Sequence, residues 1–81
     1  MRIDEFSRGY LRIKSVLGAV RISGEMTLDP FGFIVNDLTS LVWQESGVLL
    51  DDEQRAALWE FLQTEFAAAG RVLQLDSDSG R

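Results

Sequence analysis

The side chains of this chain offer few of the groups that enzymes use. The sequence contains no histidine and no cysteine, which excludes Ser-His-Asp and Cys-His catalysis and the usual zinc and haem sites. It contains neither a GxxxxGK[ST] loop nor a GxGxxG turn, the two common signatures of nucleotide binding. Carboxylates are therefore the remaining candidates for chemistry.

The adjacent acids Asp51, Asp52 and Glu53 are the strongest candidate for a cation site. Neighbouring carboxylates can bind a hard cation. However, these residues open a predicted helix, where an N-cap and negative charge in the first turn explain them without a metal. A glycosidase would need two carboxylates held across a cleft, which a fold this small is not expected to supply. We predict no enzymatic activity, no cofactor and no metal.

The acidic charge is concentrated in the second part of the chain. The net charge is −5, but residues 1–30 hold five basic and four acidic side chains, whereas residues 31–81 hold three and nine. This balance disfavours nucleic-acid binding, which requires a basic surface. An acidic second half would steer a basic protein partner toward it, or it only keeps a small domain in solution.

Residues 51–70 carry the signals of a helix and must be covered by the rest of the chain. Asp51 is a good N-cap, Gln54 completes a capping-box spacing, and Gly70 stands where the helix should end. An apolar stripe recurs at helical spacing, formed by Leu58, Phe61, Leu62, Phe66 and Ala69. Such a helix is not stable alone and needs an apolar sheet surface.

Alternating apolar and polar residues predict the strands of that sheet. The alternation is clearest over residues 20–28, and further strands are expected over residues 10–16, 33–35 and 71–75, with a hairpin turn at 17–19. Residues 1–6 form an edge strand or a lead-in, and residues 38–44 a last strand or an irregular crossing segment. We predict an α+β fold, with one long helix packed on one face of an antiparallel sheet of about four to six strands. Residues 1–75 form the single domain, and residues 76–81 a polar, disordered tail.

Some residues within these elements have competing interpretations. Gly24 in mid-strand indicates a close approach of another element, and we expect it to make room for Phe61 or Phe66. Glu65 falls within the apolar stripe. It either pairs with a basic side chain or reaches solvent, and we favour the second interpretation. Trp59 is expected in the core.

A family resemblance covers about residues 10–70. The stretch VRISGEM at 20–26, the strand GFIV at 32–35, Trp43 and the helix opening DDEQ at 51–54 resemble the immunity protein 74 family. Members are small bacterial proteins associated with polymorphic toxin systems. The resemblance implies a protein that binds one cognate toxin and blocks it without chemistry.

The expected contact surface surrounds the loop before the helix and comprises Trp43, Glu45, Asp51, Asp52 and Glu53. One interpretation makes Trp43 the aromatic anchor of this surface, because Trp is enriched at interface hot spots. The other is that the protein itself partly covers the Trp43 ring. The acids would form the rim.

The sequence gives three indications of where the protein resides. No run approaches the ~18 apolar residues of a membrane span, and the N-terminus lacks a signal-peptide core. The absence of cysteine fits the cytoplasm. The alternative is a structural or chaperone-like homodimer formed through exposed strand edges.

Overall fold

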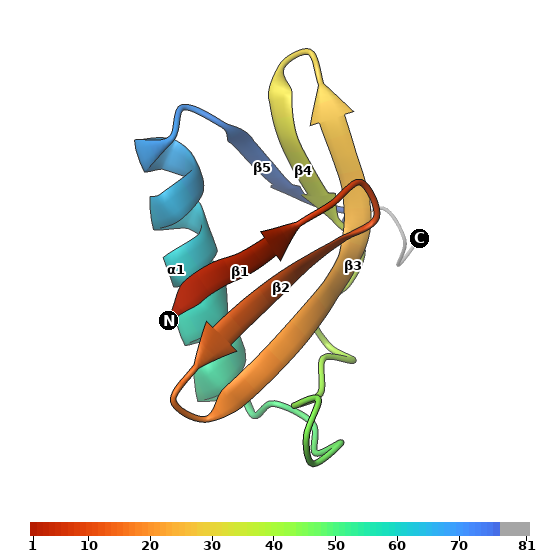
Figure 1. Cartoon of the computed structure of the whole chain (residues 1–81), viewed down its shortest axis with the longest axis vertical. Coiled ribbons are helices and arrows are strands. Elements are labelled where there is room, and N and C mark those ends of the chain that lie inside the picture. Colours follow the sequence, from red (N-terminus) through yellow and green to blue (C-terminus); the bar gives the residue numbers. More distant parts are fainter. Residues whose placement is uncertain (77–81) are drawn as a thin grey trace.

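The computed structural model describes residues 1–76 and consists of a sheet and a helix (Figure 1). The strands are β1 (Arg2–Phe6), β2 (Tyr10–Ser15), β3 (Gly18–Leu28), β4 (Phe31–Val35) and β5 (Val72–Leu75), and α1 (Asp52–Ala68) lies between β4 and β5 in the chain. The predicted α+β fold with a long helix is confirmed. Of the predicted tail, Asp76 donates its backbone N–H to the Val35 carbonyl at 2.8 Å, and residues 77–81 lie outside the described residues.

The five-stranded sheet is mixed rather than wholly antiparallel. Strands β1 to β4 pair antiparallel in chain order, whereas β5 runs parallel to β4. The connection explains this difference. After β4 the chain forms α1 before it returns to the sheet, and such a crossover brings in the next strand in the same direction. The alternation of residues 71–75 indicates a strand but does not indicate its direction.

Strand β3 belongs to two parts of the sheet. Its first half pairs with β2, from Gly18 opposite Ser15 to Ser23 opposite Tyr10, and its second half pairs with β4 from Gly24 onward. The hairpin turn lies at residues 16–17, earlier than expected, and Gly18 opens β3 with a φ of 135°. Glycine is favoured at that angle because a Cβ atom would clash.

Gly24 makes room for a strand side chain and not for the helix. A Cβ atom there would lie 2.8 Å from Cζ of Phe33 and would also meet the carbonyl of Ile34. The expectation that Phe61 or Phe66 fills this space was wrong. Strand β4 pairs directly with this half of β3, so the ring of Phe33 occupies the space first.

Helix α1 covers one face of the sheet with three buried side chains, Leu58, Leu62 and Phe66. Trp59 and Phe61 are half-buried against the same core. Ala69, expected in the stripe, is exposed because it is the C-cap, where the chain turns toward β5. Glu65 is exposed, as predicted. Within residues 1–76, no helix is long and apolar enough to cross a membrane.

One end of the molecule, which we call the aromatic end, is closed by ring packing. The ring centroid of Phe6 lies 5.6 Å from that of Phe31, 5.8 Å from Phe33 and 5.7 Å from Phe66. The guanidinium of Arg71 lies over Phe6 and Phe31, at 5.4 and 5.1 Å from the ring centroids. These contacts join β1, β4, α1 and the residue that precedes β5.

Candidate protein-binding surface

The other end of the molecule contains the segment from residue 42 to residue 53, which we call the junction. Before it, residues 38–41 are irregular rather than a strand. Its only sheet-like contacts within the described residues are isolated bridges, from Trp43 to Val20 and from Val42 to Leu49. Leu41 and Leu50 are buried at the base of the loop, where the Leu50 N–H donates to the Leu41 carbonyl at 3.0 Å.

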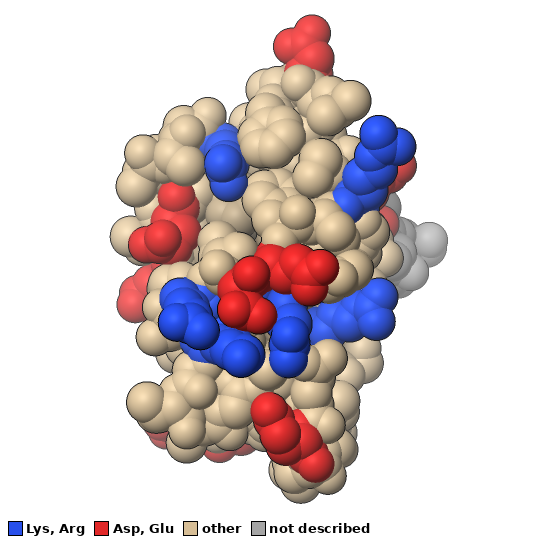
Figure 2. All heavy atoms as spheres, in the orientation of Figure 1, with Lys and Arg blue, Asp and Glu red and all other residues tan. Residues whose placement is uncertain are grey.

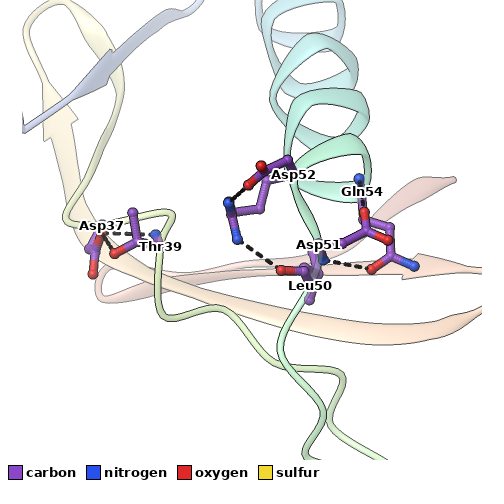
Figure 3. Close-up of polar contacts among 7 residues, drawn as sticks. Asp37, Thr39, Leu50, Asp51, Asp52 and Gln54 are labelled. Carbon is purple, nitrogen blue, oxygen red and sulfur yellow. Dashed lines mark hydrogen bonds and ion pairs between the residues drawn. The ribbon is translucent and has the colours of Figure 1, made fainter.

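The start of the helix is fixed by a complete capping box (Figure 3). Oδ1 of Asp51 accepts the backbone N–H of Gln54 at 2.8 Å, and Oε1 of Gln54 accepts the backbone N–H of Asp51 at 2.9 Å. Asp51 therefore satisfies an otherwise unpaired helix N–H. The capping function predicted for this acid is confirmed, and its contact with a partner stays a prediction.

The next acids differ in how they are held. Asp52 pairs with Arg55, whose Nη1 also donates to the Leu50 carbonyl at 2.8 Å, so that Arg55 ties the helix to the loop (Figure 3). The Asp52 side chain is nevertheless 94% exposed. Glu53 is exposed and makes no ion pair within the described residues. Both carboxylates are therefore accessible to a partner. Within residues 1–76, no cluster of three or more acids is arranged to hold a metal ion.

Trp43 is half-buried and packs against the hydrophobic core. Its backbone N–H donates to the Val48 carbonyl at 2.9 Å. Its ring lies beside Gly18, where an added Cβ atom would stand 3.5 Å from Cε3. Trp43 therefore supports the loop from the inner side, and only part of its ring is available to a partner.

Glu45 fastens the loop to strand β3. Its Oε1 accepts the backbone N–H of Ala19 at 3.2 Å. This hydrogen bond, together with one from its own backbone N–H and the attraction of Arg12 and Lys14, lowers the pKa of Glu45 below its usual value. A Cβ atom at Gly18 would lie 2.7 Å from the same oxygen, so glycine is needed for this approach. Glu45 is exposed but already has a structural role.

A further carboxylate fixes the chain before the loop. Asp37 accepts the backbone N–H of Thr39 at 2.9 Å and its hydroxyl at 2.8 Å (Figure 3). It also accepts the Ser40 hydroxyl at 3.1 Å. The N–H and O–H groups of Thr39 are the main cause of a lowered pKa for Asp37. Hydrogen bonds, rather than buried apolar side chains, therefore determine the path of much of this loop.

The residues that sequence reasoning missed are apolar. Val42, Val48 and Leu49 are 37%, 60% and 58% exposed, and we call them the loop patch. The bridge between Val42 and Leu49 places these two side chains on the same side of the loop. A sequence signal existed in the run Val48-Leu49-Leu50, because only the residue next to the N-cap is expected to pack against the helix. Leu50 does so and is 2% exposed.

The outer face of the sheet carries positive charge despite the net charge of −5. The strand register sets Arg2 opposite Lys14 and Arg12 opposite Arg21, and Figure 2 shows Lys and Arg in a band between two acidic groups. Asp4 pairs with Arg2 at 3.8 Å and with Arg12 at 3.4 Å. The predicted charge asymmetry thus becomes a basic sheet face and an acidic helix start.

Comparisons with known proteins give no match. No protein-family model, no curated protein and no solved structure matches the chain. The resemblance to the immunity protein 74 family therefore stays a hypothesis that rests on its motifs.

Proposed function

We propose that the chain is a small acidic protein-binding domain, an immunity protein of the bacterial cytoplasm that binds and neutralises a cognate toxin without catalysis. The observation that carries this proposal is the loop patch. Its members Val42, Val48 and Leu49 are exposed at 37%, 60% and 58%. They stand on a loop whose backbone is already held by hydrogen bonds. Exposed apolar side chains on a fixed loop, beside exposed acids, have the composition of a protein interface.

The acids of the junction would steer the partner rather than anchor it. Asp52 and Glu53 are exposed at the helix start, where the helix dipole already favours negative charge. A toxin that acts on nucleic acid presents a basic cleft, because its substrate is a polyanion. Complementary charge raises the association rate, and the loop patch would supply the desolvated contacts that slow dissociation. Trp43 would support the loop from within.

Co-expression with the product of the neighbouring gene tests the function. We expect the chain to restore growth of bacteria that express this product, and to bind it in a 1:1 complex. The variant Leu49→Asp should abolish both, because it places a charge in the centre of the loop patch. Leu28→Asp is the matched control, since Leu28 is 76% exposed at the far end of β3, and it should behave like the native chain. Equal behaviour of the two variants would contradict the proposed surface.

The salt dependence of association tests the steering role. The association rate constant should fall as ionic strength rises, because salt screens exposed charges. Asp52→Asn combined with Glu53→Gln should lower that rate constant and flatten its salt dependence, with little change in the dissociation rate. A salt-independent association rate for the native chain would exclude steering by these acids.

A further inference from the structure

The β2–β3 turn lies near the start of α1 (Figure 1). A second apolar surface lies between these two segments. It is a groove of about 220 Å³, which we call the hairpin groove, and its walls include Val16 and Leu17 of the turn, Trp43 of the loop, and Gln54 and Ala57 of α1. Val42 and Leu49 of the loop patch are not part of it.

The tip of the hairpin is unusual in composition. Val16 is 103% exposed and Leu17 is 63% exposed. Two-residue turns ordinarily use Gly, Asn or Asp, which tolerate the turn geometry and face water. At this tip Val16 gains nothing for the fold and Leu17 gains little, because the described part of the chain leaves the first uncovered and the second mostly exposed. Their position is explained if a second molecule covers them.

The two sides of the groove carry opposite charge. Arg2 and Lys14 border Val16 on the strand side and form the basic rim. Glu53 and Glu60 stand four residues before and three residues after Ala57, so they lie on the same face of α1 and form the acidic rim. Lys14, Glu53 and Glu60 make no ion pair with any described residue.

We propose that the hairpin groove is the interface of a two-fold homodimer. A two-fold axis that runs along the apolar strip, between the two rims, brings each rim of one copy onto the opposite rim of its partner. An apolar strip with one acidic and one basic rim is therefore complementary to itself. A partner with basic residues on both flanks would match only the acidic rim, so a second copy of this chain fits better. The loop patch stays free, although Glu53 belongs to the acidic rim as well as to the acids proposed to steer a partner, and the inference does not depend on the proposed function.

The expected dimer is weak. A standard interface covers about 800 Å² on each partner, which is roughly a seventh of the 5248 Å² surface of this molecule. The groove and its rims occupy only part of one end, so we expect a dissociation constant on the order of 10 µM. Sedimentation of the purified chain from about 1 µM to 1 mM spans this range. A native chain that stays monomeric at the highest concentration would overturn the proposal.

Substitution at the hairpin tip separates this interface from other contacts. Leu17→Asp should raise the dissociation constant by at least about tenfold, because it puts a charge into the apolar strip. Leu28→Asp makes the same chemical change at a 76% exposed position in the opposite half of β3, and it should leave the dimer unchanged. Equal weakening by both variants would contradict the groove as the interface.

A charge exchange between the rims tests the two-fold arrangement. Reversing the basic rim with Arg2→Glu and Lys14→Glu lowers the net charge from −5 to −9, and reversing the acidic rim with Glu53→Lys and Glu60→Lys raises it to −1. Each variant alone should be monomeric, because its two rims carry the same charge. Mixed together they should form a heterodimer although both are net negative. A mixture that stays monomeric would contradict the pairing of the rims.

Failure of this inference is distinguishable from failure of the proposed function. Leu17→Asp should remove the dimer and leave neutralisation by the loop patch intact, whereas Leu49→Asp should do the reverse. A native chain that dimerises but never binds the product of the neighbouring gene would remove only the proposed function.

Discussion

The two ends of the molecule are held together by different interactions. At the aromatic end, Phe6 packs on three other rings, with 5.6 to 5.8 Å between ring centroids. Among the large apolar residues of this end, only Leu28 is more than half exposed. At the junction, the carboxylates of Asp51 and Glu45 accept backbone N–H groups and fix the backbone, and Leu49 remains 58% exposed. Apolar side chains serve folding at the first end and remain available to a partner at the second.

The largest expected effect on stability lies at the aromatic end. Phe66 is 1% exposed and packs against Phe6. Phe66→Ala should lower the free energy of unfolding by about 3–5 kcal/mol, because it leaves a cavity in the core. Urea denaturation followed by circular dichroism measures this change. A loss below about 1 kcal/mol would mean that this end is not the stabilising core.

The parallel pairing of β4 and β5 should be nearly as sensitive. A Cβ atom at Gly32 would meet the backbone of Val72, with the carbonyl carbon at 2.8 Å. Gly32→Ala should therefore cost about 1–3 kcal/mol and speed hydrogen exchange of the β5 amides. Gly9→Ala is the control, because no atom lies within 4 Å of its added Cβ. Equal exchange in both variants would argue against this pairing.

At the junction, the expected effects on stability are smaller. Asp51→Ala removes the N-cap and should cost about 1 kcal/mol. Glu53→Ala, also in the first helical turn, loses only a favourable interaction with the helix dipole and should cost no more than about 0.5 kcal/mol. Thermal unfolding of the two variants compares them. A larger cost for Glu53→Ala would show that the capping box contributes little.

The smallest effect concerns pH. The Ala19 N–H and nearby cations lower the pKa of Glu45 in the folded state. The contribution of Glu45 to stability is therefore present above the usual carboxyl pKa of about 4.3 and is lost as pH falls through the lower folded value. Glu45→Gln should be less stable than the native chain at pH 7, and the difference should shrink as pH falls below the usual carboxyl pKa. An undiminished difference at low pH would exclude this linkage.

The predictable parts of the fold are those with strong periodic or capping signals. The pattern of residues 20–28 predicted much of β3, and Asp51 with Gln54 predicted the helix start. The direction of β5 depends on the crossover, which no local pattern encodes. Gly24 indicated a close approach, but only tertiary pairing identified Phe33 as the neighbour. The exposure of Leu49 had only an indirect signal, because Leu50 and not Leu49 stands next to the N-cap. The apolar run itself does not indicate which of its side chains face solvent.

We propose that the junction, and not the aromatic end, contacts the partner. The most direct test is an amide chemical-shift titration of the isotopically labelled chain with the product of the neighbouring gene. We expect the strongest shifts and line broadening on Val48, Leu49, Asp52 and Glu53, with the amides of Phe6 and Arg71 unchanged. Strong shifts confined to Phe6, Phe31 and Arg71 would contradict a contact at the junction.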